Sequence, residues 1–312
     1  MKKTFIDEIE PGQGINDIFV IRDLQSLEKK NGDPYLRLTI LDKTGEINCV
    51  MWDRVEESLS LLKSHTYARI SGKVSQYQGA LQCTVTKVED VGEVDPADFL
   101  PVVDKDIDEM TEQLLYIMQK VHNVPLGDLL DSFFDDKSFT SLFRAAPGGK
   151  AMHHAYVGGL LEHTLTMAEM GLCCCIHIPT LDSGLLITGI VLHDIGKIHE
   201  YTYDNPPIDK SDAGRLIGHI GIGLQMLDQK LKKLSEFPEA LADHLRHMII
   251  SHHGKIEWGS PEPPKTLEAV VLHNLDMLDA QVNAAKSFMD QHPGGGWTGY
   301  HRVLNRHFYK GE

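Results

Sequence analysis

The chain has 312 residues, more than one domain usually holds, and 42% of them are apolar, so we expect two globular domains. A formal net charge of −15 argues against a protein that coats nucleic acid through bulk electrostatics, but it leaves room for a local basic groove. There is no run of about 18 uninterrupted apolar residues, and the five cysteines suggest no disulfide framework. We therefore expect a cytoplasmic protein without a membrane span.

The N-terminal third has the pattern of an antiparallel β-structure. Between Gly14 and Val91, apolar and polar residues alternate, and NGDP and DKTG separate β-rich runs as hairpin turns do. About five strands fit into this length. A small closed or partly closed barrel would leave few unpaired strand edges, and we predict one here.

The string PYLRLTILDKTGEINCVMWD resembles the core of a nucleic-acid-binding OB-fold of the kind attached to tRNA synthetases and nucleases, so residues 1–95 are interpreted as an OB-fold domain. Such folds stack bases on aromatic side chains and steer phosphates with basic ones. The candidates of these two kinds are Tyr35, Arg37, Trp52, Arg54, Lys73 and Tyr77. The two tyrosines lie beside turns and are expected to be exposed, whereas a core position is favoured for Trp52.

Residues 96–110 are acidic, contain proline and show no sustained periodicity, so we interpret them as a linker. The remainder, residues 111–312, is predicted to be all helical. Met110, Leu114, Ile117 and Val121 form one apolar stripe, and a capped helix is expected near residues 128–134. The tail WTGYHRVLNRHFYK is predicted to be an amphipathic helix docked through Val303, Leu304 and Phe308, with nucleic-acid contact as the alternative.

Five short motifs in the helical part each end in a side chain that binds divalent metals. The motifs are GGLLEHT, LHDIGK, GHIG, SHHG and HNLDMLDA, and the candidate ligands are His163, His193, Asp194, His219, His252, His253 and Asp276. Asp279 shares a helix face with Asp276, and only one of the two need be a ligand. Imidazole and carboxylate together, without cysteine, suit a catalytic metal better than a structural zinc.

This order of motifs, H…HD…H…HH…D, resembles the HD-domain phosphohydrolase superfamily. The resemblance implies one metal on His163, His193, Asp194 and Asp276, and a second on His219 with one or both of His252 and His253. Asp194 would bridge the two ions, whose charge would assist phosphoester hydrolysis.

Three further residues are expected near the reaction. Lys197, one helical turn beyond His193, is a candidate catalytic residue that neutralises phosphate charge or orients the nucleophile, with a solvated surface lysine as the alternative. His153 and His154 are candidate substrate contacts. A structural polar pair at a helix start is an equally supported interpretation of these two histidines.

From MKKTFIDEIEPGQ to the FYK tail, the chain is similar to the YhaM-type 3′-to-5′ exoribonuclease family of bacteria. The resemblance implies release of mononucleotides from single-stranded RNA, with some action on single-stranded DNA. It also implies Mn²⁺ as the preferred metal, with Fe²⁺, Co²⁺ or Mg²⁺ as alternatives, and it is compatible with a homo-oligomer. Two other hypotheses stay open: an HD hydrolase of a small nucleotide or cyclic dinucleotide with a regulatory barrel, and a non-enzymatic single-strand-binding accessory protein.

Overall fold

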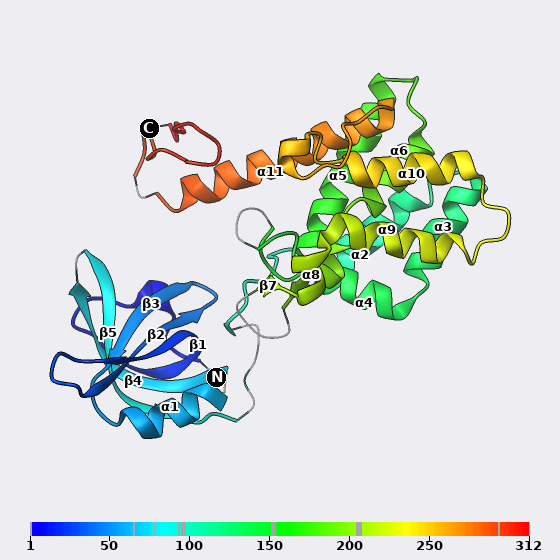
Figure 1. Cartoon of the computed structure of the whole chain (residues 1–312). Helices are drawn as coiled ribbons and strands as arrows, with labels where there is room; N and C mark the ends of the chain where they lie inside the picture. Colours follow the sequence, from blue (N-terminus) through cyan, green and yellow to red (C-terminus); the bar gives the residue numbers. More distant parts are fainter. Residues whose placement is uncertain are drawn as a thin grey trace. The chain divides into compact units, whose positions relative to one another are not determined.

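The computed structural model describes residues 2–64, 66–77, 79–92, 94, 98–150, 154–203, 208–292 and 294–311. The contacts divide the chain into two compact units, Met1–Pro101 with Tyr203–Ile208, and Val102–Thr202 with Asp209–Glu312. Figure 1 shows the barrel strands in the first unit and long helices in the second. The predicted class, an OB-fold barrel followed by a helical HD-type domain, is confirmed.

The first unit is a closed five-stranded barrel in the order β1-β2-β3-β5-β4. Its strands are β1 (Gly14–Glu28), β2 (Pro34–Asp42), β3 (Gly45–Met51), β4 (Tyr67–Tyr77) and β5 (Ala80–Glu89). All pairs are antiparallel except β3 with β5, and β1 closes the barrel on β4. Because side chains alternate along a strand, Leu36, Leu38 and Ile40 of β2 all enter the core.

A helix that we did not predict, α1 (Val55–Ser64), follows β3 and packs on β1, β2 and β5. Val55 and Leu62 are its buried contacts with the barrel. A short 3₁₀ turn, η1 (Ile6–Glu8), adds Ile6 to the same core.

The second unit begins with α2 (Ile107–Met118), which starts inside the segment that we interpreted as a linker. Its stripe of Met110, Leu114 and Ile117 is buried, as the helical spacing predicted. The next helices are α3 (Val124–Phe134) and α4 (Lys137–Ala145). The α3 helix starts earlier than expected because the Asn123 side chain accepts a hydrogen bond from the Leu126 backbone and caps it there.

The centre of the second unit is α6 (Ser183–Leu192), which is buried from Gly184 to Leu192. A helix that is apolar on all sides needs neighbours on all sides. Those neighbours include α3 as well as α5 (Gly159–His177), α10 (Glu239–Ser251) and α11 (Leu267–Asp290).

Short elements connect α6 to α10. They are α7 (Lys197–Glu200), the β6 (Tyr201–Thr202) and β7 (Asp209–Lys210) pair, α8 (Asp212–Leu216) and α9 (Gly218–Leu231). Another 3₁₀ turn, η3 (Ile256–Trp258), lies between α10 and α11.

The predicted helix in the C-terminal tail is wrong. Residues 296–311 fold back on themselves, with antiparallel bridges joining Trp297 to Tyr309 and His301 to Arg306. Leu304 and Phe308 are half-buried and line a depression with α11, whereas Val303 is exposed. In the part of the chain that the structure describes, no helix has the length and apolar character needed to span a membrane.

Candidate metal centre

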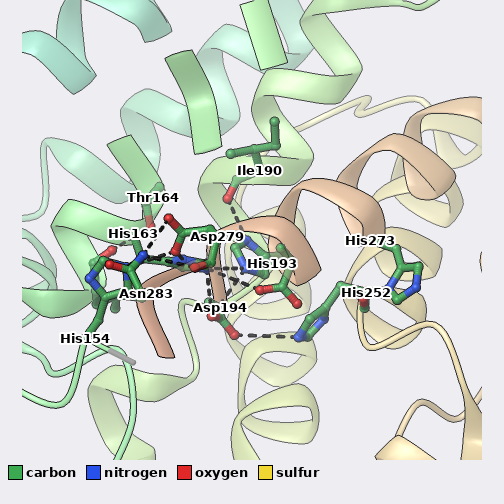
Figure 2. Close-up of polar contacts among 12 residues, drawn as sticks. His154, His163, Thr164, Ile190, His193, Asp194, His252, His273, Asp279 and Asn283 are labelled. Carbon is green, nitrogen blue, oxygen red and sulfur yellow. Dashed lines mark hydrogen bonds and ion pairs between the residues drawn. The ribbon is translucent and has the colours of Figure 1, made fainter. Parts of the chain in front are cut away.

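The seven predicted metal ligands come from five places in the second unit, each at the end of a helix or within one. His163 lies in the first half of α5, His193 and Asp194 follow the last residue of α6, and His219 lies at the start of α9. His252 and His253 follow α10, and Asp276 lies within α11. Because α5, α10 and α11 pack on α6, and α9 packs on α10, these side chains converge near the C-terminal end of α6. Figure 2 shows four of them, His163, His193, Asp194 and His252.

The first cluster consists of His163, His193 and Asp276, whose ligand atoms lie within 4.8 Å of one another. His163 Nε2 is 3.3 Å from His193 Nε2 and 3.5 Å from Asp276 Oδ1. Both histidines are fully buried, whereas Asp276 is partly exposed. Solvent therefore reaches this cluster at Asp276 and not at the two histidines.

The second cluster consists of His219, His252 and His253, whose nitrogens also lie within 4.8 Å of one another. His219 Nε2 is 3.4 Å from His252 Nε2. His252 is buried, and the other two histidines are partly exposed. Burial lowers the pKa of His252 well below its ordinary value, and burial followed by repulsion from His219 lowers that of His253. Both rings are thus neutral, the form that binds metal.

Asp194 lies between the clusters and directs one carboxylate oxygen to each. Its Oδ2 is 3.2 Å from His193 Nε2 and 3.6 Å from His163 Nε2. Its Oδ1 is 3.5 Å from His219 Nε2 and 3.6 Å from His252 Nε2. Burial would raise the pKa of Asp194, but Lys197 and His193 hold it well below the ordinary value. The group is an anion placed to face both clusters.

In each histidine of the two clusters, the Nδ1 atom faces an oxygen of the protein. His193 and His252 donate to the backbone carbonyls of Ile190 and Ile249, both at 2.7 Å. His253 Nδ1 lies 3.0 Å from the carbonyl of Trp258, His163 Nδ1 lies 2.7 Å from Asp279 Oδ2, and His219 Nδ1 lies 3.2 Å from Glu200 Oε2. A proton on Nδ1 leaves the Nε2 lone pair free to bind a metal.

This donor set fits divalent cations. Asp194 Oδ1 is buried and has no hydrogen-bond partner among the described residues. The Nε2 atoms of His163 and His193 lie 3.3 Å apart, close enough to contact the same cation. Imidazole nitrogens with two carboxylates suit a borderline to hard divalent metal.

Lys197 is buried, so the alternative of a solvated surface lysine is wrong. Its Nζ lies 2.5 Å from Asp194 Oδ2. Burial would lower the pKa of Lys197, but the attraction of Asp194 raises it above the ordinary value. The side chain is a fixed positive charge beside the shared carboxylate.

His154 is buried, and both of its ring nitrogens are engaged within the protein. Nε2 lies 2.8 Å from Asp279 Oδ2, and Nδ1 lies 2.9 Å from the Tyr156 hydroxyl and 3.2 Å from Glu162 Oε2. His153 lies outside the described residues. The Glu200 and Glu162 carboxylates were not among the predicted site residues, and Asp279 was considered only as an alternative ligand to Asp276.

The barrel has two surface depressions that contain predicted binding residues. One is lined by polar residues at paired positions on three neighbouring strands, Thr39 on β2, Asn48 on β3 and Gln82 on β5. Arg37 lines the same depression, and its guanidinium donates a hydrogen bond to the Gln25 side chain. The other contains Arg54 and Trp52. Lys73 and Tyr77 are exposed on β4.

The core position favoured for Trp52 is wrong. Its side chain is 43% exposed and stacks on the half-buried Tyr35 with ring centroids 4.9 Å apart. Lys29 Nζ lies 5.7 Å from the Trp52 ring centroid. A partly exposed aromatic pair with a lysine beside it is therefore present on the barrel surface.

Comparison with known proteins agrees with this architecture. Residues 20–91 match the OB-fold nucleic acid binding domain, and residues 160–281 match the HD domain, which contains all seven predicted metal ligands. Fold and site together define a metal-dependent hydrolase of the HD class that carries an OB-fold barrel.

Full-length relatives identify the family. The chain is 30% identical to the 3′-5′ exoribonuclease YhaM of Halalkalibacterium halodurans, over 96% of this chain and 93% of the relative. It is 31% identical to the protein of the same name from Bacillus subtilis, over 96% of both chains. The chain belongs to the YhaM 3′-5′ exoribonuclease family.

Proposed function

We propose that this protein is a metal-dependent 3′-to-5′ exoribonuclease that hydrolyses single-stranded RNA, and also single-stranded DNA, to mononucleotides. The observation that carries the proposal is Asp194, whose two oxygens face two separate histidine clusters. A carboxylate in that position is suited to a pair of ions held close together, as in two-metal phosphodiester hydrolysis.

In this proposal, the first cluster with Asp194 Oδ2 holds one ion, and the second cluster with Asp194 Oδ1 holds the other. We propose Mn²⁺ for both positions, because imidazole nitrogen and carboxylate oxygen together accommodate it. When bound, two divalent ions stabilise the charge that develops on a phosphoryl group and its leaving oxygen.

The residues of the chain itself have distinct tasks in this mechanism. The buried Lys197 ammonium fixes the orientation of Asp194 through its 2.5 Å contact with Oδ2 and adds positive charge where a phosphate would bind. Backbone carbonyls hold His193 and His252 in the tautomer that leaves Nε2 unprotonated. Partly exposed Asp276 and His253 mark the sides from which a strand end can approach.

The barrel supplies the strand-binding part of the proposal. Trp52 and Tyr35 offer an aromatic surface for base stacking, and Arg37, Arg54 and Lys29 offer positive charge for phosphates. Lys73 and Tyr77 on β4 extend the proposed interface. Such local contacts bind a single strand despite the net charge of −15.

The test uses chelator-stripped protein supplied with Mn²⁺ and a 5′-labelled single-stranded RNA, with a labelled cyclic dinucleotide in parallel. We expect a ladder of products that shortens from the 3′ end. The matched variant Asp194→Asn keeps the shape of the side chain and removes the charge between the clusters. It should therefore lose RNA hydrolysis to background while retaining single-strand binding.

Two results would contradict the proposal. Hydrolysis of the cyclic dinucleotide alone would assign the barrel a regulatory role in a small-molecule hydrolase. Undiminished RNA hydrolysis by Asp194→Asn would move the reaction away from the two clusters.

A further inference from the structure

Each cluster contains one histidine whose Nδ1 faces a carboxylate that is outside the seven predicted ligands. In the first cluster this histidine is His163, which faces Asp279, and in the second it is His219, which faces Glu200. The other three histidines direct Nδ1 to backbone carbonyls. The pattern is thus one carboxylate-backed histidine per cluster.

Asp279 lies on α11, three residues beyond Asp276, and is buried. Its Oδ2 lies 2.7 Å from His163 Nδ1 and 2.8 Å from His154 Nε2 (Figure 2). Its Oδ1 accepts a hydrogen bond of 3.0 Å from the Asn283 amide, one helical turn further along. These contacts fix the carboxylate, and through it the ring of His163.

Glu200 ends α7 and is also buried. Its Oε1 accepts a hydrogen bond of 3.0 Å from Lys210 Nζ on β7. Its Oε2 lies 3.2 Å from His219 Nδ1 without the alignment of a good hydrogen bond. The contact is within ion-pair distance, so Glu200 faces the Nδ1 side of His219.

We propose that Asp279 and Glu200 are positioning residues that serve different metal ions, Asp279 through His163 and Glu200 through His219. The inference rests on the proposed metal centre and adds to it two residues that touch neither metal nor substrate. A carboxylate that accepts the Nδ1 proton fixes the ring orientation and makes Nε2 a stronger ligand. Because each carboxylate contacts a histidine of one cluster, its loss should weaken the binding of one ion and leave the binding of the other unchanged.

The experiment is calorimetric titration of Mn²⁺ into the chelator-stripped full-length chain, with electron paramagnetic resonance of free Mn²⁺ to count bound ions. We expect two binding steps for the unmodified protein. Asp279→Asn should weaken one step about 10- to 100-fold, and Glu200→Gln should weaken the other by a similar factor. The double variant should weaken both.

Three further variants separate positioning from loss of structure. Glu268→Gln, a buried carboxylate on α11 that accepts from the Asp182 backbone, should change neither step. Asn283→Ala leaves the Asp279 carboxylate in place but removes the amide that donates to its Oδ1 and that also contacts His154 Nε2, and it should weaken the same step as Asp279→Asn. Lys210→Met removes the Lys210 contact with Glu200 and should weaken the same step as Glu200→Gln.

The outcomes distinguish this inference from the proposed function. Weakening of the same step by both carboxylate variants, or of neither step, would overturn the inference and leave the proposed function standing. A single bound ion in the unmodified protein would overturn the inference together with the two-ion form of the proposed function. No Mn²⁺ binding by the unmodified protein would contradict the metal centre itself.

Discussion

Asp17 shows how one buried carboxylate attaches the N-terminal segment to the barrel. Its Oδ2 accepts hydrogen bonds from the Lys3 and Thr4 backbones at 2.6 and 2.7 Å, and its Oδ1 accepts one from the Ile18 backbone at 2.8 Å. Burial alone would raise the pKa of Asp17, but these three donors lower it below the ordinary value. The ionised form therefore stabilises the folded barrel.

We predict that Asp17→Asn lowers the free energy of unfolding of the barrel at pH 7 by about 1–3 kcal/mol, because backbone donors lose a charged acceptor. The pKa of Asp17 is lower in the folded state than its value of about 4 in the unfolded state, so the ionised carboxylate stabilises the fold at pH values above about 4. This stabilisation is lost as the pH falls through the folded-state pKa. The difference between variant and unmodified protein should shrink below pH 4. Urea unfolding at pH 7 and at pH 3 measures this difference. Trp52 fluorescence reports the unfolding of the barrel when Trp258 and Trp297 are replaced by Phe in both proteins. A difference that is equal at both pH values would contradict the role of the charge.

Trp52 shows where residue-level prediction failed. A core position is common for an aromatic residue within a strand, but β3 ends at Met51 and the chain turns there towards α1. Trp52 lies beyond the strand, where period-two placement no longer applies. The partial burial of Tyr35 has the same origin, because the two rings stack on each other.

At the scale of elements, the close approach of the turn before α7 to α9 depends on Gly196. A Cβ atom at this position would lie 2.0 Å from the His219 carbonyl oxygen and 2.7 Å from the Gly223 nitrogen. Both of these are backbone atoms of α9, which carries His219. Glycine in HDIGK therefore sets how closely the second cluster can approach Asp194.

We predict that Gly196→Ala destabilises the second unit by about 1–3 kcal/mol, as overpacking does, and weakens Mn²⁺ binding at the second cluster. The matched control is Gly223→Ala on α9, whose added Cβ would meet its nearest atom at an ordinary 3.5 Å. That control should change stability by less than about 1 kcal/mol. Thermal unfolding and Mn²⁺ titration of both variants measure the effects, and equal behaviour of the two would refute the packing argument.

Helices with a long apolar stripe were predictable from sequence, because burial of one face imposes a helical period. The stripe of α2 and the apolar α6 are examples. The tail was not predictable in this way. Its spacing of apolar residues also suits a helix, but backbone pairing between Thr298 and Phe308 and between Gly296 and Lys310 holds it in a folded-back form.

At the scale of the whole molecule, strand binding and hydrolysis are proposed to reside in different units. We predict that removal of residues 1–101 weakens binding of long single-stranded RNA, because the chain loses the barrel that is proposed to bind the strand and that is tethered to the hydrolytic unit. Cleavage of a dinucleotide should persist, since all seven predicted ligands lie in the second unit. Turnover of 2-mer and 30-mer RNA by full-length and truncated protein tests this. An equal effect of truncation on both substrates would argue against delivery by the barrel.

The sequence was sufficient for the two-part architecture and for the ligand series, because alternation, helical period and metal-binding side chains are local patterns. It was not sufficient for Asp279 and Glu200. Their contacts with His163 and His219 join α11 to α5 and α7 to α9, and only tertiary packing creates them. Asp279 was noticed through its spacing from Asp276, yet the spacing alone did not reveal which carboxylate faces which side of the imidazole.

The order of the ligands along the chain has a consequence for biosynthesis. The second cluster needs His253, and the first needs Asp276, so neither exists in a nascent chain that stops before those residues. The barrel, by contrast, is encoded entirely by the first third of the message. During translation, the residues of the barrel therefore emerge from the ribosome before the residues that complete the metal centre have been synthesised. Premature termination would yield a fragment that carries the barrel without hydrolytic capacity.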